Sequence, residues 1–204
     1  MKTLAEYQKI ARDEQWAIPH FNISTLEQLW GIALAAKESS SPALVGTSEG
    51  ERDFMGMRQV VTLIRSFQEE GIALFLNADH CKSPESALEA FRAGYDSVHV
   101  DLSKESLTVN TEGVRRVVET VKEKNPTVQV EGELGYLMTD SSKVYSEEII
   151  IPEESYTNVE QAVEFVQKTG VDRFAPAVGT LHGIAANKPN IRFDLAQDLA
   201  KAVG

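Results

Sequence analysis

The sequence predicts an α/β protein, an incomplete (β/α)8 TIM barrel with about six βα units in its 204 residues. Short apolar runs alternate with longer amphipathic stretches, and most predicted strands begin roughly 25 to 40 residues apart, the period of a βα unit. Polar residues follow several different strands, and in a parallel barrel all these carboxyl ends face one mouth. An open doubly wound sheet has the same spacing, but no GxGxxG turn follows the first predicted strand.

Strands are predicted at the apolar runs, namely 17–22, 43–48, 72–79, 97–101, 128–133 and 173–180. Helices are predicted at the amphipathic stretches, namely 3–14, 25–38, 53–70, 84–93, 106–124, 157–169 and 194–203. Ser83 and Pro84 suit a helix start, and Gly94 and Gly170 suit helix ends. A complete barrel needs about 250 residues, so we expect the last two strands to lie beyond this chain.

The composition is that of a soluble globular protein, and residues 1–204 are predicted to form a single domain. Charged residues make up 25% and apolar residues 42% of the chain, and no repeat or linker interrupts the pattern. The formal net charge of −11 disfavours binding to nucleic acid. It also means that a phosphorylated substrate must be held locally, by backbone N–H groups or a metal.

The single cysteine, Cys81, cannot form an internal disulfide, which fits a reducing compartment. The N-terminal segment does not resemble a signal peptide, and no segment approaches the ~20 apolar residues of a membrane span. We therefore expect a cytoplasmic protein that does not associate with a membrane.

The segment 77–81 (NADHC) ends an apolar strand with ionisable residues. A carboxylate there is costly unless it is paired, hydrogen-bonded or close to a metal. One interpretation makes Asp79 a proton-transfer group beside a metal-binding His80. The other makes the segment a strand-end turn in which Asp79 caps the next helix.

His182 follows the sixth predicted strand between Gly179 and Gly183, where a histidine can project into the mouth while the backbone approaches a ligand. A loop histidine with no ligand is the alternative. His80 and His182 are far apart in the sequence, yet both follow strands that end at one mouth. That convergence favours the functional interpretation of both.

Carboxylates follow two more strands. Glu131 and Glu133 share one face of a strand, and two like charges there favour a nearby cation over a solvent-facing pair. Asp101 lies near a strand end, where it can ligate or orient a site. His99, which is deeper in the same strand, and His20 are interpreted as structural.

Two other barrel chemistries fit less well. Metal-dependent hydrolases usually need an HxH pair on the first strand, and 18–22 (IPHFN) has one histidine. A Schiff-base aldolase needs a lysine on a barrel strand, and strand 173–180 has none. Polarisation of a carbonyl by a metal is the simpler chemistry.

Taken together, these motifs resemble those of the class II fructose-bisphosphate and tagatose-bisphosphate aldolases. The resemblance runs in order along almost the whole chain, through IPHFN at 18–22, ADH at 78–80, GYDSV at 94–98, VDLS at 100–103, VEGELG at 130–135, TGVD at 169–172 and GTLHG at 179–183. Several short motifs in one order are far more specific than any single one.

The resemblance implies a zinc enzyme in which His80 and His182 match two of three zinc-binding histidines. Asp79 matches the acid/base that exchanges a proton with the C4 hydroxyl, while zinc holds dihydroxyacetone phosphate and stabilises its enediolate. Glu133 and Asp101 match carboxylates near the metal. Gly183 matches a backbone contact to the ketose phosphate or to a bound monovalent cation. Asn22 and Ser48 correspond loosely to substrate contacts.

The sequence departs from the family pattern in three respects. The third zinc histidine and the phosphate-binding loops of the family belong to strands seven and eight, which we expect beyond this chain. The segment 136–142 has no glutamate to accept the C1 proton, which leaves Glu147 and Glu148 as distant candidates. Asn77 and His99 stand where the family more often has a histidine and a methionine.

The function that the resemblance implies is reversible aldol cleavage of a ketose 1,6-bisphosphate, with the fructose isomer as the commoner family substrate. A related aldolase acting on tagatose bisphosphate and a non-catalytic truncated barrel that binds partners remain as alternatives. The family is usually dimeric or larger, so we expect a homo-oligomer, or a second chain that supplies the missing strands. A barrel that is not closed exposes sheet edges, which invites such pairing.

Overall fold

The computed structural model describes residues 2–139, 143–188 and 190–204. Contacts between Cα atoms divide the chain into two compact units. The first unit comprises residues 1–100 and 116–131, and the second comprises residues 101–115 and 132–204. The prediction of a single domain over 1–204 stays a prediction.

Six strands follow one another in the order β1-β2-β3-β4-β5-β6, so each strand neighbours the next one in the sequence. Their bounds are β1 His20–Asn22, β2 Ala43–Thr47, β3 Leu74–Cys81, β4 Ser97–Val100, β5 Gln129–Leu134 and β6 Arg173–Pro176. Within the first unit, β1 pairs with β2, β2 with β3 and β3 with β4, all in parallel. Parallel neighbours joined by helices are the βα units that the sequence predicts, and the predicted fold class is confirmed.

The α-helices lie where the amphipathic pattern places them, with one exception, and the short 3-10 helix η1 has no predicted counterpart. Their bounds are α1 Leu4–Asp13, α2 Leu26–Ser39, α3 Glu49–Met55, α4 Met57–Glu69, α5 Pro84–Ala93, α6 Leu107–Lys124, η1 Glu153–Ser155, α7 Val159–Thr169 and α8 Phe193–Val203. The single helix predicted at 53–70 is wrong, because Gly56 adopts a φ of 81° and separates two helices. A side chain is disfavoured in that conformation, which glycine adopts without steric cost.

Strand β3 continues two residues further than predicted and carries the segment NADHC within it. Its pairing with β4 shifts register between Ala78 and Cys81. His80, inside this irregularity, has a φ of 45°, which is uncommon for any residue other than glycine. Asp79 and His80 therefore belong to a bulged strand end and do not form a simple turn before α5.

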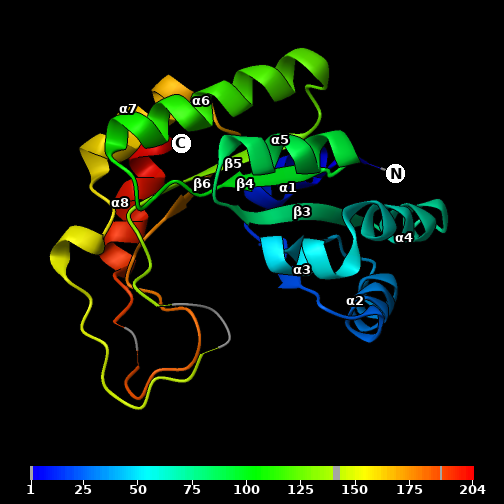
Figure 1. The fold of residues 1–204 in the computed structure, drawn as a ribbon, viewed down its shortest axis with the longest axis horizontal. Helices are drawn as coiled ribbons and strands as arrows, with labels where there is room; N and C mark the ends of the chain where they lie inside the picture. The colour runs from blue at the N-terminus through cyan, green and yellow to red at the C-terminus, as the bar shows by residue number, and fades with distance from the viewer. Residues whose placement is uncertain (1, 140–142, 189) are drawn as a thin grey trace. The chain divides into compact units, whose positions relative to one another are not determined.

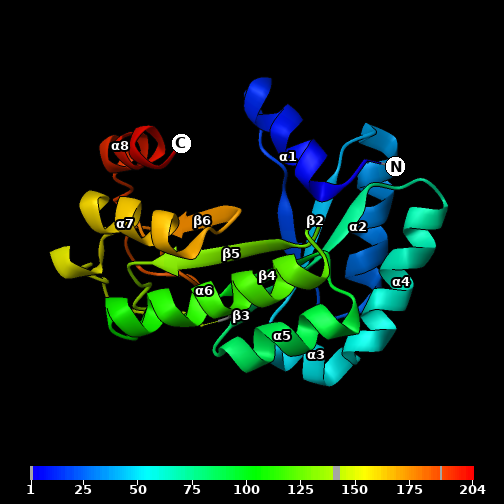
Figure 2. The ribbon, with the colours of Figure 1, turned by 90° about the horizontal axis from the view of Figure 1, so that it is seen from above.

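In the first unit, helices α2, α3, α4 and α5 pack along one side of strands β2 to β4 (Figure 2). Helix α1 contributes Leu4 to a separate apolar cluster with Leu44 of β2 and Phe75 of β3. The Tyr7 ring meets the Phe75 ring edge to face at 5.8 Å between centroids. Because Leu44 and Phe75 lie near the amino ends of their strands, α1 packs away from the carboxyl ends, which remain available for a site.

In the second unit, two long connections lie side by side beyond β5 and β6 (Figure 1). Tyr145 N–H donates to the Ile184 carbonyl at 2.8 Å, and Ile184 N–H donates to the Lys143 carbonyl at 2.9 Å. The Asn187 side chain exchanges two hydrogen bonds with the backbone of Ile149. Among the described residues, no helix is long and apolar enough to cross a membrane.

Candidate functional site

In the first unit, polar side chains converge where strands β1, β2 and β3 end. Asn22 Nδ2 donates to Asp79 Oδ2 at 2.9 Å and approaches Glu51 Oε2 at 3.4 Å. Glu51 lies in the first turn of α3, where its carboxylate accepts from Ser48 N–H at 2.6 Å and Ser48 Oγ accepts from Glu51 N–H. This reciprocal cap joins the end of β2 to the first turn of α3, and the contact of Asn22 with Glu51 links both to the end of β1. Asn22 is thus a direct partner of Asp79.

Two imidazoles lie on the other side of the Asp79 carboxylate. His99 Nδ1 is 3.6 Å from Asp79 Oδ1, and His80 Nε2 is 3.9 Å from the same oxygen. The two imidazole rings lie 4.5 Å apart between centroids. His99 is buried in β4, whereas Asp79 and His80 are partly exposed. The bulge in β3 is what places His80 beside a residue of the neighbouring strand.

The surroundings hold the Asp79 carboxyl in its charged form. Burial raises its pKa, but the hydrogen bond with His99, the charge of His80 and the hydrogen bond from Asn22 outweigh burial. The net effect is a pKa well below the usual range of an aspartate. A carboxylate kept ionised at a strand end can accept a proton or hold a cation.

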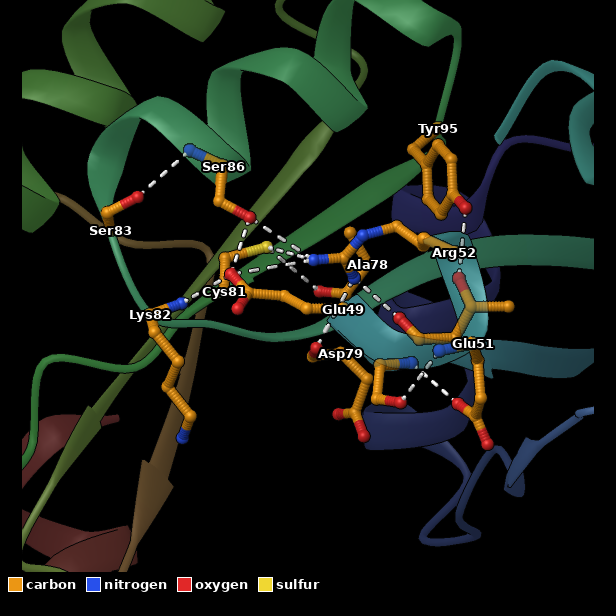
Figure 3. A network of polar contacts seen from close by, with 12 residues as sticks. Glu49, Glu51, Arg52, Ala78, Asp79, Cys81, Lys82, Ser83, Ser86 and Tyr95 are labelled. Carbon is orange, nitrogen blue, oxygen red and sulfur yellow. Dashed lines mark hydrogen bonds and ion pairs between the residues drawn. The ribbon is translucent and has the colours of Figure 1, made fainter. Parts of the chain in front are cut away.

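A buried arginine fixes the backbone beneath this carboxylate (Figure 3). Arg52 of α3 is 4% exposed, and its Nη1 donates to the carbonyls of Thr47 at 2.6 Å and Asp79 at 3.4 Å. Its Nη2 contacts Cys81 Sγ at 3.6 Å and Ser86 Oγ at 3.3 Å. One guanidinium therefore joins the ends of β2 and β3 to the first turn of α5.

Glu49 completes the network around the arginine. Its Oε1 accepts from Ser86 Oγ at 2.6 Å and from Lys82 N–H at 3.0 Å, and it lies 3.9 Å from Arg52 Nη2. Burial raises the pKa of the Cys81 thiol to about 11. The thiol is fully buried, so Cys81 is a packing residue here and not a nucleophile.

In the second unit, two of the predicted carboxylates lie together. Carboxylate oxygens of Asp101 and Glu133 are within 4.8 Å of one another, and both side chains are buried. Asp101 Oδ1 accepts from the backbone and the hydroxyl of Ser103, at 3.2 and 2.6 Å. Asn110 of α6 donates to the Glu133 carbonyl at 2.8 Å. Buried carboxylates this close suit a cation between them.

His182 and Gly183 also belong to the second unit, in the connection after β6. His182 N–H donates to Thr139 Oγ1 at 2.8 Å, which fixes the backbone at that histidine. Gly183 is exposed and has a φ of 71°. Residues 140–142 of the loop without a glutamate lie outside the described residues, and both Glu147 and Glu148 are exposed.

Sequence reasoning named Asp79 and His80, and the structure brings around them groups that it had given other roles or none. Asn22 was expected to contact substrate and Ser48 likewise; the structure places them as a partner of Asp79 and as the N-cap of α3. His99 was interpreted as structural, yet it faces Asp79. Arg52 carried no signal, because an arginine in an amphipathic stretch is normally solvated.

The donors present suit a divalent metal, and two observations support this. Asp79, His80 and His99 each offer one ligand atom, and these atoms all lie within 4.8 Å of one another. Imidazole and carboxylate together are the usual ligands of zinc. The carboxylates of Asp101 and Glu133, which lie close to each other in the second unit, are likewise of the type that holds a cation.

Comparison with known proteins identifies the family. The pattern of the family described as fructose-bisphosphate aldolase class-II matches residues 2–203. This chain is a class II fructose-bisphosphate aldolase family member. The predicted resemblance is confirmed, and with it the assignment to an aldolase family.

Two curated relatives of this aldolase family member have similar names. A Bacillus subtilis (strain 168) protein named "Probable fructose-bisphosphate aldolase" is 32% identical over 206 residues, covering 99% of this chain and 70% of the relative. The fructose-bisphosphate aldolase of Staphylococcus aureus (strain Mu50 / ATCC 700699) is 31% identical over 198 residues, covering 95% of this chain and 67% of the relative. The crystal structure of the YdjI aldolase from Escherichia coli K12 superposes with a TM-score of 0.82 at 26% identity, covering 98% of this chain and 69% of that one.

Proposed function

We propose that this chain carries the chemistry of a metal-dependent aldolase that reversibly cleaves fructose 1,6-bisphosphate into dihydroxyacetone phosphate and glyceraldehyde 3-phosphate. Family membership supports the reaction class. The observation that carries the proposal is the Asp79 carboxylate, which is held between Asn22, His80 and His99 at the end of β3. A fixed, ionised carboxylate at that place is what proton exchange with a substrate hydroxyl requires.

Asp79 is the acid/base in this proposal. In the cleavage direction it accepts the proton of the C4 hydroxyl as the C3–C4 bond breaks, and in the condensation direction it returns the proton to the C4 oxygen. The hydrogen bond from Asn22 fixes the carboxylate plane, so one oxygen stays oriented. The lowered pKa of Asp79 keeps its carboxylate ionised at neutral pH, the form that can accept the C4 hydroxyl proton.

A bound divalent metal, zinc by resemblance, would polarise the ketose carbonyl and stabilise the negative charge of the enediolate. We propose His80 and His182 as ligands with Glu133 and Asp101 as nearby carboxylates, an assignment that follows the family motifs. Cobalt, iron and manganese also suit imidazole and carboxylate donors. Gly183 is proposed to contact the phosphate or a monovalent cation, and Asn22 and Ser48 to contact substrate.

The proposal is tested by the substitution Asp79→Asn. The amide keeps the shape of the side chain but cannot accept the C4 hydroxyl proton. We expect kcat for fructose 1,6-bisphosphate cleavage, measured with zinc in excess, to fall by about a hundredfold or more.

Asp53→Asn, an identical change at an exposed position of α3, is the control and should leave kcat unchanged. Tagatose 1,6-bisphosphate is assayed beside the fructose isomer, because the two differ only in configuration at C4. A purified protein that cleaves neither sugar in the presence of zinc, or an Asp79→Asn variant with full kcat, would contradict the proposal.

A further inference from the structure

We infer that His99 is a metal ligand, and that Asp79, His80 and His99 together form a divalent-cation site within the first unit. The inference rests on the proposed function in one respect, since both require a cation at His80. It adds a donor that the family motifs do not include, because the family more often has a methionine at this position. A methionine thioether is a soft ligand suited to Cu(I), whereas imidazole suits zinc.

The distances fit such a site. The three ligand atoms lie within 4.8 Å of one another, with His99 Nδ1 at 3.6 Å and His80 Nε2 at 3.9 Å from Asp79 Oδ1. In a tetrahedral zinc site with ligands at about 2.0–2.1 Å, neighbouring ligand atoms are roughly 3.3 Å apart. Small side-chain rotations therefore bring all three donors onto one ion.

The backbone around the site supports the same inference. His80 has a φ of 45°, an uncommon conformation for a histidine that the bulge in β3 maintains. Arg52 donates to the Asp79 carbonyl and contacts Cys81, so it holds the residues immediately before and after His80 (Figure 3). These contacts orient the donors before any ion arrives.

The second carboxylate oxygen of Asp79, Oδ2, has a hydrogen-bond partner of its own. Asn22 Nδ2 bonds to Oδ2, while Oδ1 is the oxygen nearest both imidazoles. An outer hydrogen bond of this kind is what usually orients a ligating carboxylate. With Oδ1 bound to a cation, Oδ2 is the oxygen left to exchange a proton with the C4 hydroxyl in the proposed function.

The experiment titrates the metal-free protein with Zn²⁺ and Co²⁺, following Zn²⁺ by competition with a chelating dye and Co²⁺ by its visible absorption. His99→Met removes the imidazole and keeps a side chain of similar size. We expect the dissociation constant for Zn²⁺ to rise about tenfold or more and the Co²⁺ spectrum to change. His20→Gln, which removes an exposed imidazole outside the cluster, should change neither.

His182→Gln separates this inference from the proposed function. If the unmodified protein binds no divalent cation, both proposals fail. If His182→Gln weakens binding while His99→Met leaves the dissociation constant and the Co²⁺ spectrum unchanged, the proposed function stands and His99 is not a ligand.

A measurement on the unmodified protein covers the case in which His99→Met does not fold. Protein labelled with ¹⁵N-histidine is loaded with ¹¹³Cd²⁺, and ring-nitrogen couplings to cadmium are recorded by NMR. We expect resolved couplings for both His80 and His99. Coupling to His80 without coupling to His99 would overturn the inference.

Discussion

The orientation of Asp79 depends on a residue with no side chain, Gly46 of β2. A Cβ atom placed there would lie 2.2 Å from Asn22 Oδ1 and 2.4 Å from His20 Nε2. Both atoms are the ends of side chains on β1, so a methyl group would displace those side chains more readily than the backbone. The Asn22 side chain that bonds to Asp79 can keep its position only beside a glycine.

Gly46→Ala should therefore reduce activity as well as stability. We expect kcat for aldol cleavage to fall about tenfold or more because Asn22 no longer holds Asp79, while the free energy of unfolding falls by about 1–2 kcal/mol. Gly31→Ala is the control, since nothing lies within 4 Å of that position in α2. It should raise the free energy of unfolding by about 0.5–1 kcal/mol and leave kcat unchanged. A Gly46→Ala variant that loses stability but keeps the kcat of the unmodified protein would contradict this account.

Cys81 makes stability depend on pH in the alkaline range. Its pKa is raised from 9.0 to about 11 by burial, so the folded state keeps its thiol protonated where the unfolded state ionises. This contribution is fully present below pH 9 and is lost as pH rises towards 11. Urea unfolding at pH 8 and pH 10.5 should show a loss about 2 kcal/mol larger in the unmodified protein than in Cys81→Ala. Identical losses in both proteins would show that ionisation of the Cys81 thiol does not cause the pH dependence of stability.

At the scale of elements, Arg52 joins α3, β2, β3 and α5 through one buried guanidinium. The sequence pattern predicts each of these elements separately, because each has its own apolar periodicity and caps. The pattern does not predict that Arg52 connects these elements, since the partners of Arg52 are backbone carbonyls and side chains as many as 34 residues away. The break at Gly56 was not predicted because the residues on both sides of it, in α3 and α4, have helical patterns.

Arg52→Met tests how much these guanidinium contacts contribute to stability. The thioether side chain fills part of the volume but leaves the Thr47 and Asp79 carbonyls without the guanidinium, so we expect the free energy of unfolding to fall by about 2–4 kcal/mol. Arg58→Met, at an exposed position of α4, should change it by less than about 0.5 kcal/mol. Both are measured by urea unfolding followed by circular dichroism. A loss of unfolding free energy in Arg52→Met no greater than in the control would mean that the Arg52 contacts contribute nothing to stability.

At the scale of the whole molecule, the net charge of −11 opposes the approach of an anionic sugar bisphosphate. Added salt screens that repulsion over a Debye length of about 10 Å at 0.1 M. We expect the KM for fructose 1,6-bisphosphate to fall as NaCl rises from 10 to 100 mM, with kcat nearly constant. A KM that rises with NaCl over this range would show that a local positive site dominates over the net charge.

The sequence by itself determined the βα alternation, the order of the strands, the family and the positions of Asp79 and His80. These depend on local periodicity and on motifs that lie along the chain. Only the tertiary structure decided that His99 and Asn22 face Asp79, that Arg52 lies beneath it, and that β3 bulges at His80. Such contacts join residues of different strands and helices, and hydrophobic periodicity carries no information about which side chains meet once the elements pack.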